Sequence, residues 1–234
     1  MCLGDSVTYG AGVSFEETYE QQLEKTLKAR GLDAKIINAG IGSQCVWHGL
    51  ERLEKDVIRF KPDIVTICFG LNDGALSGQT LWDEWKAKLA QQKSSGSVQR
   101  PLVDSSHQEK RTRLVPSVPI VEFEKNLKTL VAQLRTRTQA KVYLLTFNSV
   151  SDDYQSSQWS RELLKRQRSV YGRYRDQVLE IARATQLKSA DVYQRFERSG
   201  KSLLNPDGIY PNAQGMTVYA QELLKQILTH LANP

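Results

Sequence analysis

Apolar and polar residues alternate along the chain in two patterns, one typical of helices and one typical of buried strands. Apolar residues recur at helical spacing in five segments, which are 14–31, 46–60, 121–138, about 160–186 and a final segment from Pro211. Nearly continuous apolar runs at 63–69 and 141–147 predict strands covered on both faces, and shorter strands are predicted at 34–40 and 188–193. This alternation predicts a three-layer α/β/α sandwich with a mainly parallel sheet.

Local signals set the expected ends of several helices. Ser14 and Glu17 form a capping-box pattern, and Gly31 is a natural helix stop. One helical face is predicted over 46–60 from its regularly spaced apolar residues, which are Val46, Leu50, Leu53, Val57 and Phe60. Pro211 suits the first turn of the last helix, whose inward residues would be Tyr219, Leu223, Ile227 and Leu231.

A polar, basic stretch interrupts this pattern at about 76–118. Residues 84–118 hold seven basic against three acidic side chains, a net charge of +4 within a chain total of +6. A nucleic-acid groove would interleave basic residues with aromatic ones, and this stretch has only Trp85, so a solvated basic loop is favoured. We expect a single domain over 1–234, with this stretch as an insertion.

Composition narrows the class further. The chain is 40% hydrophobic and 25% charged, which suits a soluble protein with a real core, and no apolar run is long enough to span a membrane. Cys2, Cys45 and Cys68 are too few and too scattered for a disulfide framework or a zinc site.

The N-terminus leaves the compartment open. Only three residues precede Gly4, fewer than a typical first strand. No signal peptide is visible, which favours the cytoplasm if the chain is complete. A chain that has lost upstream residues could instead be secreted or periplasmic, and the oligomeric state is likewise open.

The loops that follow the predicted strands carry the candidate chemistry. Ligands of such sheets bind beyond the carboxyl ends of the strands. Ser6 lies in a glycine-flanked turn there, Gly40 and Gly42 leave backbone N–H groups accessible, and Asn72 offers a side-chain amide. A hydroxyl, backbone donors and an amide are the outline of a nucleophile with an oxyanion hole.

Four segments in order resemble the SGNH (GDSL-type) hydrolase superfamily. "LGDSVTYG" is similar to its nucleophile block, "INAGIGSQC" to its glycine block, "ICFGLND" to its asparagine block and "NPDGIYPNAQG" to its Asp-x-x-His block. The resemblance covers nearly the whole chain apart from the basic insertion. It implies the flavodoxin-like SGNH fold and an esterase or acyl hydrolase acting on a small ester or an acetylated carbohydrate. It also implies that no metal or organic cofactor takes part.

The resemblance also implies roles for individual residues. Ser6 would be the nucleophile. Its own N–H, an N–H from the glycine block and the Asn72 amide would form the oxyanion hole. Asp207 would orient a histidine at position 210, which would activate Ser6.

Two positions depart from the family pattern. Alignment on "GLERL" places Ser43 where many members have the oxyanion glycine, with Gly42 one residue earlier, and the sequence leaves the choice between them open. Tyr210 stands where the histidine is expected. A phenol has a pKa of about 10 and cannot act as an effective base near pH 7, and a nearby Asp207 would raise that pKa further.

Three histidines remain as possible replacements for the base. His48 lies on the helix after the glycine block, His107 in the basic insertion and His230 four residues from the end. A surface role is the ordinary expectation for each. Trp47, Trp82 and Trp85 flank the predicted site loops and could line a pocket, although packing is the ordinary role.

Three functions therefore compete. The first is a serine esterase that is weak or altered because Tyr210 replaces the base. The second is an inactive relative that binds a ligand or partner. The third is an acyltransferase on the same scaffold, which no specific residue favours.

Overall fold

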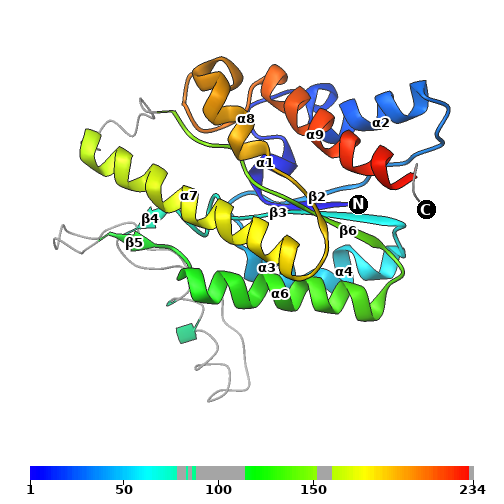
Figure 1. The fold of residues 1–234 in the computed structure, drawn as a ribbon, viewed down its shortest axis with the longest axis horizontal. Helices are drawn as coiled ribbons and strands as arrows, with labels where there is room; N and C mark the ends of the chain where they lie inside the picture. The colour runs from blue at the N-terminus through cyan, green and yellow to red at the C-terminus, as the bar shows by residue number, and fades with distance from the viewer. Residues whose placement is uncertain (78–82, 84–85, 88–113, 152–159, 232–234) are drawn as a thin grey trace.

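Five parallel strands form the central sheet. The computed structural model describes residues 1–77, 83, 86–87, 114–151 and 160–231. Within these residues the strand order is β2-β1-β3-β6-β7 (Figure 1). The strands are β1 (Cys2–Gly4), β2 (Asn38–Gly40), β3 (Ile64–Cys68), β6 (Lys141–Leu145) and β7 (Lys188–Ala190). The predicted parallel sheet is confirmed.

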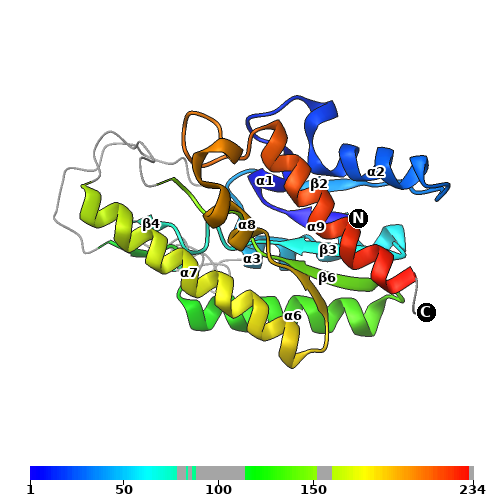
Figure 2. The same cartoon turned by 45° about the horizontal axis from the view of Figure 1, so that its top comes forward.

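Helices cover both faces of this sheet, which confirms the three-layer arrangement (Figures 1 and 2). One face carries α2 (Tyr19–Ala29), α8 (Val192–Ser199) and α9 (Ala213–Leu231), and α2 packs along α9. The other face carries α3 (Val46–Glu51), α4 (Leu53–Asp56) and α6 (Ile120–Arg137). The long α7 (Arg161–Ala184) packs against α6, β6 and β7. The short α1 (Ser6–Tyr9) directly follows β1.

The core lies between the sheet and these helices. Leu3, Ile67 and Leu144 in the strands are almost fully buried, as are Leu130 in α6 and Tyr219 in α9. Since both faces are covered, the central strands need apolar residues on both sides, which explains their continuous apolar runs.

The continuous helix predicted over 46–60 is wrong. It is divided into α3, α4 and a 3₁₀ turn at Ile58–Phe60. The backbone leaves helical geometry at Val57 (φ −130°, ψ −63°). The helical period is therefore lost before Phe60, which is 47% exposed although Val46, Leu53 and Val57 are buried.

Pro211 does not lie in the first turn of α9, contrary to expectation. The helix begins at Ala213, and Pro211 pairs with Leu204 in an isolated antiparallel bridge. Asn212 caps the helix instead, because its Oδ1 accepts from Gly215 N at 3.0 Å. The predicted inward residues Tyr219, Leu223 and Ile227 are buried.

A small antiparallel ribbon closes the base of the basic insertion. It joins β4 (Leu76–Ser77) to β5 (Val115–Pro116), with Ser77 opposite Val115. Most of the stretch between them lies outside the described residues.

Candidate active site

Ser6 lies just after the carboxyl end of β1, an inner strand of the sheet, as the first residue of α1. Asp5 caps this helix, because its Oδ1 accepts from Val7 N at 2.9 Å. Ser6 is buried, with 6% of its surface exposed. Its hydroxyl makes no hydrogen bond to another of the described residues.

The glycine block follows β2 and runs beside this turn. Gly40 is paired with Gly4, and Ile41 N donates to the Gly4 carbonyl at 3.2 Å. Ser43 has a φ of 59°, in the left-handed region, whereas Gly42 does not have a positive φ. The backbone conformation that favours glycine is thus carried by Ser43, the residue aligned with the family's oxyanion glycine.

Asn72 follows β3 and ties the three loops together. Its Nδ2 donates to the Gln44 carbonyl at 3.1 Å and to Asp5 Oδ2 at 3.3 Å. Both amide hydrogens are therefore engaged, the second in a long and weak bond. An oxyanion could therefore bind Asn72 Nδ2 only by replacing that weak contact.

Two buried carboxyl groups lie within these loops. Burial raises the pKa of Asp5 to about 7, although hydrogen bonds from Val7 and Asn72 oppose the shift. Burial also raises the pKa of Asp73 to about 8. Asp73 Oδ1 accepts from Val46 N at 3.0 Å, while Oδ2 has no partner among the described residues.

Asp207 and Tyr210 lie in the loop before α9. Asp207 is exposed, and its Oδ1 accepts from the backbone N–H groups of Ile209 at 2.7 Å and Tyr210 at 3.0 Å. A Cβ placed on Gly12 would lie 3.4 Å from Tyr210 Cβ, so residue 210 borders the loop that follows α1. Within the described chain, no hydrogen bond joins the Tyr210 hydroxyl to Asp207 or Ser6.

Two asparagines that the sequence did not single out hold this loop. Asn205 Nδ2 donates to the Gly12 carbonyl at 3.1 Å, which joins the loop to the nucleophile region. Asn148 Nδ2 donates to the Ile209 carbonyl at 2.7 Å, and Asn148 Oδ1 accepts from the Tyr219 hydroxyl at 3.0 Å.

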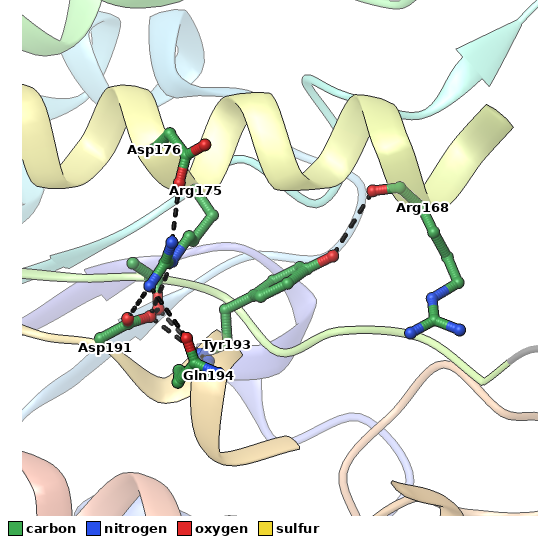
Figure 3. Close-up of polar contacts among 7 residues, drawn as sticks. Arg168, Arg175, Asp176, Asp191, Tyr193 and Gln194 are labelled. Atoms are coloured by element: carbon green, nitrogen blue, oxygen red, sulfur yellow. Dashed lines mark hydrogen bonds and ion pairs between the residues drawn. The ribbon is translucent and has the colours of Figure 1, made fainter. Parts of the chain in front are cut away.

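The chain that leads into this loop is anchored to α7 (Figure 3). Asp191, which caps α8, accepts from Arg175 of α7, with Arg175 Nε 3.1 Å from Asp191 Oδ1. The Tyr193 hydroxyl donates to the Arg168 carbonyl at 3.4 Å, about two turns before Arg175 along α7. These contacts hold the start of α8, which precedes the Asp207 loop in the chain, against α7.

Of the three histidines, the structure describes the side chain of His48. His48 Nδ1 accepts from Cys45 N at 3.0 Å, and its ring stacks on Trp47 with centroids 3.4 Å apart. No hydrogen bond connects His48 with the Ser6 hydroxyl. His107 and the side chain of His230 lie outside the described residues, as do Trp82 and Trp85.

Other kinds of site find no support in the described parts of the chain. No group of three or more His, Cys, Asp or Glu residues there could hold a metal ion. The three cysteines are free, buried thiols. None of the helices described has both the length and the apolar character needed to cross a membrane.

The fold, with its serine turn after β1 and its asparagine after β3, is that of the SGNH class of hydrolases. A family model described as the GDSL-like lipase/acylhydrolase family matches residues 2–218, and the chain belongs to this family.

The individual relatives have low sequence identity to this chain or match only part of it. An acetylxylan esterase of Geobacillus stearothermophilus is 24% identical over 200 residues, covering 84% of this chain and 73% of that protein. An arylesterase of Vibrio mimicus is 34% identical over 74 residues, so the match spans only 37% of its length and 32% of this chain. The crystal structure of Axe2, an acetylxylan esterase from G. stearothermophilus, has a TM-score of 0.65 at 22% identity, covering 97% of this chain and 92% of that one.

Proposed function

We propose that the protein hydrolyses carboxylic esters with Ser6 as the nucleophile, at a rate limited by the missing histidine. The observation that carries this proposal is that the loops after β2 and β3 form hydrogen bonds with each other and with Gly4 and Asp5, the two residues before Ser6. The Ser6 and Ser43 N–H groups and the Asn72 amide would stabilise the tetrahedral oxyanion. Gly42 lacks the left-handed backbone and is the weaker alternative to Ser43.

The comparison with Axe2 supports the role of the last loop. Variants described as catalytic mutants of that enzyme replace a serine, an aspartate and a histidine, the last two being three residues apart. Asp207 and Tyr210 have the same spacing. Asp207 Oδ2 is not used by the backbone of its own loop and could orient a histidine at position 210.

Replacing Tyr210 by histidine tests the proposal directly. In serine proteases, loss of a triad member costs a factor of about 10⁴ or more in kcat. We therefore expect Tyr210→His to raise the turnover of 4-nitrophenyl acetate by at least about 100-fold over wild type. Ser6→Ala should abolish that gain.

Tyr210→Phe is the matched control, because it removes only the phenol oxygen. Unchanged turnover is expected. Robust wild-type turnover that Tyr210→Phe abolishes would show that the phenol itself is catalytic. If Tyr210→His gains nothing and Ser6 does not react with a fluorophosphonate probe, the results favour instead an inactive relative that binds a ligand or a partner.

An acetylated carbohydrate is the substrate class that we propose. Tyr9, in α1 three residues after Ser6, is 65% exposed, and Ile41, after β2, is 41% exposed. A Cβ placed on Gly40 would lie 2.2 Å from Tyr9 N, so the backbones of these two loops are in contact. An exposed aromatic and aliphatic pair beside the nucleophile suits the apolar face of a sugar ring.

Truncating Tyr9 tests the substrate class. Tyr9→Ala should lower kcat/KM on an acetylated xylo-oligosaccharide by about 10-fold, since an aromatic contact contributes about 0.5–1.5 kcal/mol. Turnover of 4-nitrophenyl acetate should stay unchanged. Val121→Ala, at a similarly exposed apolar residue of α6, is the control. Equal losses on both substrates would rule out a sugar contact.

A further inference from the structure

The guanidinium of Arg52, at the junction of α3 and α4, reaches three separate segments. Its Nε donates to Gln44 Oε1 at 2.7 Å, and its Nη2 donates to the Gly4 carbonyl at 2.9 Å. Its Nη1 lies 3.2 Å from Asp56 Oδ2. The side chain is only 10% exposed, so these contacts are shielded from water.

Two of these three acceptors adjoin candidate oxyanion donors. Gly4 ends β1 and lies two residues before Ser6. Gln44 follows Ser43, and the Gln44 carbonyl accepts from Asn72 Nδ2 at 3.1 Å. Through Gly4 and Gln44, one guanidinium therefore fixes the spacing between the loops that carry Ser6, Ser43 and Asn72.

A lysine could not make the same set of contacts. The planar guanidinium presents donors in fixed, diverging directions, whereas an ammonium is a single point charge on a flexible stem. The three acceptors of Arg52 belong to β1, to the glycine block and to α4. The conservative change Arg52→Lys would keep the charge and lose this geometry.

We propose that Arg52 is a positioning residue that sets the geometry of the oxyanion hole through Gly4 and Gln44. This inference rests on the proposed ester hydrolysis at Ser6. Under this proposal, Arg52 affects the stability of the tetrahedral intermediate and not the binding of the substrate in its ground state. A displacement of about 1 Å in such donors can cost a factor of about 100 in rate.

Phenylboronic acid provides a test that does not require turnover. The Ser6 oxygen adds to boron, the hydroxyl proton passes to water, and the resulting tetrahedral anion occupies the oxyanion hole. We expect Arg52→Lys to weaken phenylboronic acid binding, measured by calorimetry, by about 10- to 100-fold. In a Tyr210→His background kcat should fall by a similar factor with KM little changed.

Arg137→Lys is the matched control, since Arg137 pairs with Glu54 of the same α4 but contacts none of the site loops. Its boronate affinity should equal that of wild type. Gln44→Ala keeps Arg52 but removes one of its acceptors, so it should also weaken phenylboronic acid binding. If Arg52→Lys does not fold, Gln44→Ala tests the proposal in its place. The double variant should lose less binding free energy than the two single variants together, because both changes break the same Arg52–Gln44 contact.

The possible failures are distinguishable. If wild type does not bind phenylboronic acid, the oxyanion hole is absent, and the proposed function falls together with this inference. If wild type binds but a folded Arg52→Lys or Gln44→Ala binds equally well, only the positioning role is overturned.

Discussion

At the scale of single residues, Ser43 has a left-handed backbone at the position that aligns with a family glycine. A non-glycine residue in the left-handed region costs roughly 1–2 kcal/mol, and glycine avoids this cost. The greater freedom of glycine in the unfolded chain offsets about 0.4–1 kcal/mol of that gain. Since the proposed donor is the backbone N–H, the Ser43 hydroxyl should be dispensable.

Ser43→Gly should therefore raise the free energy of unfolding by up to about 1 kcal/mol. It should leave the rate of fluorophosphonate labelling of Ser6 within about two-fold of wild type. Ser43→Val, whose branched side chain is strained at φ 59°, should instead lower the unfolding free energy. A marked loss of labelling in Ser43→Gly would show that the hydroxyl takes part.

At the scale of elements, Asp73 links the loop after β3 to the first turn of α3 through Val46 N. Its pKa is about 8 in the folded protein and about 4 in an unfolded chain. The folded state therefore holds more protons between these values, and the free energy of unfolding should fall as pH rises from about 4 to 8. Asp5, with a pKa raised to about 7, acts in the same direction.

Asp73→Asn keeps the acceptor for Val46 and removes the titration. The slope of unfolding free energy against pH, from urea titrations at pH 5, 7 and 9, should be smaller than in wild type. At pH 5, where Asp73 is neutral, the two proteins should agree within about 1 kcal/mol. An unchanged slope would mean that Asp73 is ionised in the folded state throughout.

Some of the structural elements could be predicted from the sequence, and others could not. The strands at 64–68 and 141–145 were predictable because covered parallel strands must be apolar on both faces. Residues 148–151 are mostly polar and yet buried, and Asn148 forms hydrogen bonds with the Ile209 carbonyl and the Tyr219 hydroxyl. Burial of such polar residues depends on distant partners that no periodic pattern encodes.

The candidate site could likewise be predicted from the sequence only in part. Ser6, Ser43 and Asn72 could be assigned to one edge of the sheet, because parallel strands bring their carboxyl ends together. The contacts of Arg52 could not be foreseen, since one of its acceptors is a backbone carbonyl far away in sequence. Whether Asp207 and Tyr210 complete the site stays a prediction that the Tyr210→His variant tests.

At the scale of the whole molecule, a short antiparallel ribbon of β4 and β5 brings the two ends of the basic insertion together. Ser77 and Val115 are paired across it, so the ends of the insertion already lie side by side. The core residues that the structure describes, in the sheet and in the helices on both faces, lie at or before 77 and from 114 onward. We therefore expect the α/β/α domain to fold without that segment.

Replacing residues 78–113 by a short Asn-Gly turn tests this expectation. Leu114 is kept, because its carbonyl accepts from Arg166 of α7 at 2.6 Å. The free energy of unfolding should be unchanged or higher by up to about 2 kcal/mol, since each halving of a loop saves about 0.6 kcal/mol of closure entropy. Near-ultraviolet circular dichroism should keep its wild-type tertiary signal. If this signal disappears, the segment belongs to the core, and the sheet with its flanking helices is not an independent folding unit.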